Sequence, residues 1–314
     1  MKIFTELLEG GSNSMQKRKK ATLYVICATL ALLAALLLLL LAVVVFSSIK
    51  NSSDKKQTPS ESISIGNTET VTLSQADIHS GKLLLLNAEN PLKSAPQVML
   101  IATDRPKTEA GRPVYSVLGM ANLSLEYDAL KQFNLMAEQF YKNTKDDNLF
   151  VSTAYDASKS SQSPLYEAGN TVALGYYSTN EKGETLRNES IYNVDKFSWI
   201  YSNAHKYGFV LLTSEAQTDD NGKSLGSNVF RYVGAPHSVA MASKKLSFES
   251  YLEYLKTKTS VDSPLSVKAS GKTYAIYYVA AAAEHKVPTE YAYTVSGNNT
   301  DGYIITVDLS KKLS

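Results

Sequence analysis

The sequence predicts an α+β protein with a small C-terminal β segment, tethered to a membrane by one N-terminal helix. Three observations predict this: an apolar run at 21–46, helical periodicity between Leu125 and Lys145, and β-branched, tyrosine-rich stretches after Pro264. The expected parts of the 314-residue chain are a cytoplasmic tail (1–20), a transmembrane helix (21–46), a disordered tether (47–70), a globular domain (71–262) and a β appendage (263–314).

Composition excludes several classes of function. The 32 lysine and arginine residues nearly balance the 30 acidic residues, so no nucleic-acid partner is expected. The single cysteine, Cys27, lies in the apolar run, which excludes an intramolecular disulfide and a thiolate metal cluster. The chain contains neither a Gly-x-Ser-x-Gly nucleophile motif nor a glycine-rich phosphate loop.

The N-terminal apolar run predicts a membrane anchor. Ala21 to Phe46 exceeds the roughly 20 apolar residues that a helix needs to cross a bilayer. The basic cluster from Lys17 to Lys20 predicts a cytoplasmic N-terminus and an extracytoplasmic remainder. A cleaved signal peptide is the alternative, but its apolar region is usually about 7–15 residues, so a retained anchor is favoured. The polar residues from Ser47 to Thr70 predict the tether.

Periodicity predicts the main elements of the globular part. The helix between Leu125 and Lys145 has an apolar stripe consisting of Leu130, Phe133, Met136, Ala137 and Phe140. Order is expected to begin at Val71. Strands are expected at 83–87, 150–155, 273–279, 291–295 and 303–307.

The segment from Trp199 to His237 carries the most informative pattern. Its apolar residues follow helical spacing up to Gly208, and an apolar, strand-like run comes next, so we expect a helix, a glycine stop and a strand. With the phrases Asn203-Ala-His-Lys-Tyr-Gly-Phe and Arg231-Tyr-Val-Gly, this segment resembles the VanY-type zinc D-alanyl-D-alanine carboxypeptidases. The resemblance implies the α+β fold of that family (Hedgehog/DD-peptidase type) from Val71 to about Lys258.

The resemblance also implies where the chemistry of the family would lie. The family holds zinc through two histidines and one aspartate, and a glutamate serves as general base for the attacking water. The matching positions hold Tyr166, Ala173 and Val229 in place of the zinc ligands, and Gly226 in place of the glutamate. These replacements predict that zinc is absent and that the protein does not hydrolyse peptides.

The histidines do not restore the site through another register. None lies between His79 and His205, and both His205 and His237 match non-ligand histidines of the family, for which packing hydrogen bonds are expected. Where the family has a tyrosine followed by an arginine that grips the substrate carboxylate, this chain has Tyr155 and Asp156. Asp156 would repel that carboxylate, or else serve as a solvated turn residue. The candidate cleft residues are Tyr155, Asp156, Tyr166, His205, Arg231 and His237.

These observations predict an inactive, membrane-anchored carboxypeptidase-like protein on the outer face of a bacterial cytoplasmic membrane. Its expected partners are the membrane and a peptidoglycan stem peptide or a cell-wall synthesis protein, which it would bind or scaffold. Two alternatives stay open: an active D,D-carboxypeptidase with unrecognised ligands, and a spacer that presents the C-terminal β segment.

Overall fold

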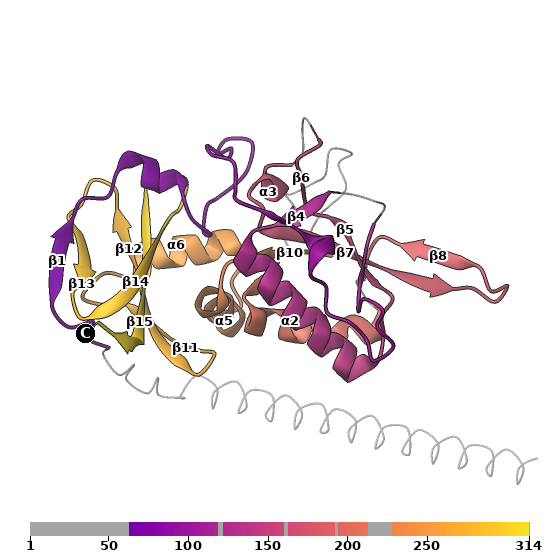
Figure 1. The fold of residues 1–314 in the computed structure, drawn as a ribbon. Helices are drawn as coiled ribbons and strands as arrows, with labels where there is room; N and C mark the ends of the chain where they lie inside the picture. Colours follow the sequence, from indigo (N-terminus) through magenta and orange to yellow (C-terminus); the bar gives the residue numbers. More distant parts are fainter. Residues whose placement is uncertain (1–62, 119–121, 160–162, 192–193, 213–227, 314) are drawn as a thin grey trace, which may run out of the picture. The chain divides into compact units, whose positions relative to one another are not determined.

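The computed structural model describes residues 63–118, 122–159, 163–191, 194–212 and 228–313, which belong to one compact unit (Figure 1). Within these ranges, no helix is long and apolar enough to cross a membrane. The predicted tail at 1–20 and the predicted transmembrane helix at 21–46 lie outside the described residues, as does most of the predicted tether.

A mixed six-stranded sheet, called the central sheet below, positions the candidate site. Its order is β3-β5-β7-β10-β9, and β8 pairs with β7. The β3–β5 pair is parallel, and the other pairs are antiparallel. The strands are β3 (Ser116–Val117), β5 (Leu149–Thr153), β7 (Thr171–Thr179), β8 (Thr185–Asn188), β9 (Phe209–Leu211) and β10 (Val229–Tyr232).

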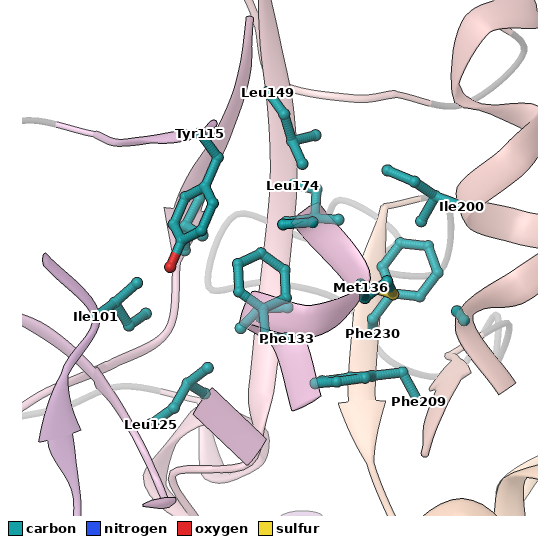
Figure 2. Close-up of a cluster of buried hydrophobic side chains, with 14 of the residues drawn as sticks. Ile101, Tyr115, Leu125, Phe133, Met136, Leu149, Leu174, Ile200, Phe209 and Phe230 are labelled. Carbon is teal, nitrogen blue, oxygen red and sulfur yellow. The ribbon is translucent and has the colours of Figure 1, made fainter. Parts of the chain in front are cut away.

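One face of the central sheet is covered by α2 (Tyr127–Thr144), which confirms the helix predicted between Leu125 and Lys145. All five residues of the predicted apolar stripe are buried, because a helix that packs on a sheet turns its apolar face toward the strands. Figure 2 shows Phe133 of this helix among strand side chains that include Leu174 and Phe230.

The opposite face of the central sheet packs with α5 (Ala235–Lys244) and α6 (Phe248–Lys258). Alternation along the strands separates the two faces. Val172 and Leu174 of β7 belong to the hydrophobic cluster under α2, whereas Ala173 belongs to the cluster that includes residues of α5 and α6.

The strands after residue 263 form a four-stranded antiparallel sheet, called the C-terminal sheet, with the order β11-β12-β15-β14. Its strands are β11 (Leu265–Ala269), β12 (Lys272–Ala280), β14 (Tyr291–Gly297) and β15 (Gly302–Lys312), which confirms the three strands predicted here. Ile276 and Ile304 on one face join the same hydrophobic cluster as Ala173. The two sheets therefore share a core.

The other face of the C-terminal sheet is covered by the beginning of the described chain. β1 (Thr68–Val71) pairs with β13 (His285–Pro288), and Ile65 packs in the same cluster as Tyr277. A short 3-10 helix, η1 (Gln75–His79), follows β1. Order therefore begins earlier than the predicted start at Val71, because the partner strand that orders β1 lies near the other end of the chain.

The strand predicted at 83–87 is not observed. This segment is buried at three leucines but belongs to no strand. Its backbone groups are used elsewhere: the Leu84 carbonyl accepts a hydrogen bond from the Arg231 guanidinium at 2.8 Å, and the Leu85 N–H donates to the Asn298 carbonyl at 2.9 Å. An apolar run alone does not distinguish a strand from a buried, irregular segment.

Candidate functional site

The first half of the segment from Trp199 to His237 folds as predicted. Its helical turns are η3 (Asp195–Phe197), α4 (Ser198–Asn203) and η4 (Ala204–Tyr207). They end at Gly208, and β9 follows directly. Gly208 has a φ of +87°, and a Cβ atom there would lie 2.5 Å from the ring of Tyr232. Both the backbone conformation and the close packing therefore require glycine.

Arg231 of β10 is a structural residue in this arrangement. It is 1% exposed, donates to the Leu84 carbonyl at 2.8 Å, and places its guanidinium 4.4 Å from the centroid of the Phe248 ring. Burial lowers its pKa to about 10, partly offset by Glu249 and Glu126, so it remains charged at neutral pH. Its position fixes the 83–87 segment over the central sheet and does not present a free cation to a ligand.

The three positions that the resemblance predicts to match zinc ligands lie close together. Ala173 of β7 and Val229 of β10 are register partners, and Tyr166 lies on α3 (Pro164–Glu167). All three are buried in the hydrophobic cluster that includes α5 and α6 residues. Their side chains do not fit a zinc ion, since alanine and valine carry no ligand atom. Gly226, which matches the glutamate, lies outside the described residues.

Tyr155 and Asp156 form β6 at the edge of a small sheet with β4 (Leu123–Leu125) and β2 (Met99–Leu100). The Asp156 carboxylate is 6% exposed and accepts hydrogen bonds from the Ser158 N–H and hydroxyl at 3.0 and 2.6 Å. These bonds lower the pKa of Asp156, so the group is ionised at neutral pH. Asp156 therefore stabilises a turn, as one of the two interpretations of the sequence expected, although it is not a solvated residue. The repulsion of a substrate carboxylate stays a prediction.

His237 of α5 joins three elements. Its Nδ1 lies 2.9 Å from the Tyr251 hydroxyl of α6, and its Nε2 lies 3.0 Å from the Thr306 hydroxyl of β15. The ring is 6% exposed, and burial, together with the nearby charge of Lys82, lowers its pKa to about 3. The neutral imidazole has one donor and one acceptor nitrogen, which suits two hydroxyl partners.

The six candidate residues do not meet in one cleft of the described structure. His205 lines a hollow of about 180 Å³ beside α5, whereas His237 lines a cleft of about 470 Å³ beside the C-terminal sheet. The other four line neither. The larger cleft is also lined by Lys82, Tyr274 and Asp308, which sequence reasoning missed because they come from separate segments and belong to no local motif.

Among the described residues, no group of three or more His, Cys, Asp or Glu side chains could hold a metal ion. The pattern of the zinc site is thus not reproduced by other described residues around Tyr166, Ala173 and Val229.

Comparison with known proteins identifies the relatives. The chain is 31% identical over 249 residues to a D-alanyl-D-alanine carboxypeptidase of Enterococcus faecium, covering 77% of this chain and 80% of the relative. Its fold matches the vancomycin-resistance D,D-dipeptidase VanXYg, solved with a D-Ala-D-Ala phosphinate analog, with a TM-score of 0.55 at 22% identity over 77% of this chain and all of the other. No family model matches the sequence.

The comparisons correct one expectation. A VanY D,D-pentapeptidase, 15% identical over 55% of this chain and 98% of the other at a TM-score of 0.33, was solved in complex with Zn(II). The prediction that zinc is absent is contradicted by the family of the relative from Enterococcus faecium, because D-alanyl-D-alanine carboxypeptidases of this type hold zinc; Ala173 and Val229 themselves carry no ligand atom. On the basis of the relative from Enterococcus faecium, which the chain matches over four fifths of its length, this chain belongs to the D-alanyl-D-alanine carboxypeptidase family.

Proposed function

We propose that this protein recognises peptidoglycan-type peptides at the bacterial cell wall and does not hydrolyse them. Membership of the carboxypeptidase family supports the class of ligand, and VanXYg, whose fold it shares, was solved with a D-Ala-D-Ala analog. The observation that carries the absence of hydrolysis is the pairing of Ala173 with Val229 across β7 and β10. Two positions that match catalytic-site ligands of the family hold apolar side chains, packed side by side.

The chemistry of peptide hydrolysis explains why apolar side chains at Ala173 and Val229 argue against activity. Zinc peptidases activate a water molecule and need a general base to take its proton. Neither alanine nor valine can orient a metal-bound water, and the 6% exposed phenol of Tyr166 is a poor substitute for an imidazole. Apolar side chains at these positions instead avoid the cost of burying an unpaired polar group. The fold is retained while hydrolysis is lost.

We place the protein on the outer face of the cytoplasmic membrane, held by Ala21 to Phe46. Protease added to intact cells should clip the chain between Ser47 and Glu61 and release a fragment that contains the compact unit. Recovery of the untreated protein in the soluble fraction, beginning near Ser47, would show cleavage of a signal peptide and contradict the anchor.

The test of recognition without hydrolysis uses the full chain in detergent and a stem pentapeptide that ends in D-Ala-D-Ala. Zinc is added to every reaction, so that metal supply does not decide the outcome, and the carboxypeptidase from Enterococcus faecium serves as the active control. We expect D-Ala release by the control only, and sedimentation of this protein with purified peptidoglycan. D-Ala release that a chelator abolishes would contradict the proposal, and so would failure to bind both peptidoglycan and the pentapeptide.

A further inference from the structure

The cleft of about 470 Å³ beside the C-terminal sheet is separate from the family site. It lies between β14, the start of α5 and the segment from Gly81 to Leu83. None of its lining residues is Tyr166, Ala173 or Val229. Its volume is within the range of about 300–1,000 Å³ that is typical of ligand sites.

The cleft follows the edge of a sheet. All five consecutive residues from Ala292 to Ser296 line it, and Thr306 and Asp308 of β15 and Tyr274 of β12 line it as well, so the cleft includes the length of β14 and part of the adjoining sheet face. β14 is the last strand in the order β11-β12-β15-β14, and among the described strands it pairs only with β15. Its outer edge therefore faces the cleft without a partner strand.

The alternation of hydrogen bonds along β14 shows which of its backbone groups point away from β15. The Asn298 N–H donates to the Gly302 carbonyl of β15, whereas the Gly297 N–H donates outward to the Ser80 carbonyl at 2.7 Å. Because hydrogen-bonded and non-bonded positions alternate in an antiparallel pair, Val295 and Tyr293 also direct their N–H and C=O groups outward. No hydrogen bond to these groups is formed within the part of the chain that the structure describes.

One end of this edge is already closed by the chain itself. Ser80 pairs with Gly297, and Gly81 approaches β14 so closely that a Cβ atom on it would lie 2.8 Å from the Ser296 Cα. At the other end, a bulge interrupts the pairing between Tyr291 and Ala292. The open edge therefore accommodates a short extended segment that pairs with the two free residues.

The charges around the cleft favour an acidic occupant. Lys82 is paired with Asp128 at 2.5 Å, and Asp308 is paired with Lys272 at 2.6 Å. Lys311 also lines the cleft, near the bulge, and takes part in none of the ion pairs among the described residues, whereas the neighbouring Lys312 pairs with Glu290 at 3.6 Å. The unpaired charge among the residues that line the cleft is therefore the positive charge of Lys311, at the end of the cleft opposite Ser80.

We propose that this cleft binds an extended peptide bearing a carboxylate, which adds as a further strand to the free edge of β14 with its carboxylate beside Lys311. Strand addition obtains its affinity from main-chain hydrogen bonds to an open edge, which Tyr293 and Val295 provide. Thr294 lies between them and lines the cleft, so its side chain contacts the added strand. The site is distinct from the positions on which the absence of hydrolysis rests, because none of its lining residues is Tyr166, Ala173 or Val229.

The experiment measures hydrogen–deuterium exchange of the full chain in detergent. The probe is an acetylated tetrapeptide of alternating valine and threonine with a free C-terminal carboxylate, and its C-terminal amide is the matched control. At about twice the Kd of the probe, the amides of Tyr293 and Val295 should exchange about threefold more slowly. The amides of Thr294 and Ser296, which already bond to β15, should change much less.

Three variants separate the parts of the proposal. Thr294→Trp should fill the cleft and abolish binding, whereas Thr294→Val, of nearly the same volume, should retain it. Lys311→Met should weaken binding of the acid about two- to fivefold and leave binding of the amide unchanged. No saturable binding up to about 1 mM probe, or binding without protection of Tyr293 and Val295, would overturn the proposal. So would self-association of the chain through this edge that the probe does not displace.

Discussion

Acidification from pH 7 to pH 5 should destabilise the protein through His237. Its imidazole is buried between Tyr251 and Thr306, with a pKa lowered to about 3 by burial. In the unfolded chain the pKa returns to about 6.5. Below pH 6.5 the unfolded state therefore binds a proton that the native state does not. Stability is fully present above that pH and is lost as the pH falls toward 3.

The magnitude follows from the width of this window. Between pH 6.5 and pH 5 the native ring of His237 stays neutral while the unfolded one becomes protonated, which costs about 2 kcal/mol at about 1.4 kcal/mol per pH unit. For a domain of this size, that loss corresponds to about 4–8 °C in Tm. Thermal unfolding of the full chain in detergent at the two pH values, followed by circular dichroism, measures it.

The matched variant is His237→Gln, which keeps a hydrogen-bond donor and an acceptor but does not titrate. It should be less stable than the wild type at pH 7 and should lose several degrees less on acidification. The difference between the two losses isolates His237 from other groups, including His205, whose pKa burial also lowers. Equal losses of Tm in both proteins would refute the argument.

Two further substitutions test the scaffold of the site. Gly208→Ala should lower the free energy of unfolding, measured by thermal melts, by more than the control Gly183→Ala does. Both glycines have a positive φ, so both substitutions strain the backbone. Only at Gly208 would the new Cβ atom collide with Tyr232, whereas Gly183 has open space around it. Arg231→Lys should lower the free energy of unfolding by about 1–3 kcal/mol, because an ammonium group cannot keep both the hydrogen bond to the Leu84 carbonyl and the planar contact with Phe248. An unchanged Tm would show that only the positive charge of Arg231 matters for stability.

Local patterns predicted those elements whose cause is local. The helix α2 was predictable because its apolar stripe repeats at the helical period, and the stop at Gly208 because a left-handed helix end favours glycine. The 83–87 segment was not predictable, because Arg231 and Asn298, which take its backbone groups, lie far along the chain. β1 was missed for the same reason, since its order depends on β13.

In the candidate site, too, the features that depend on local sequence could be predicted, and those that depend on distant segments could not. Tyr166 and Ala173 could be named from their spacing to Gly169, and Val229 from its spacing to Arg231, but only strand register shows that Ala173 faces Val229. The cleft along β14 had no such phrase. In chain order β14 precedes β15, but in the C-terminal sheet β15 lies between β12 and β14. That order leaves β14 outermost, so none of the described strands pairs with the outward backbone groups of Tyr293 and Val295.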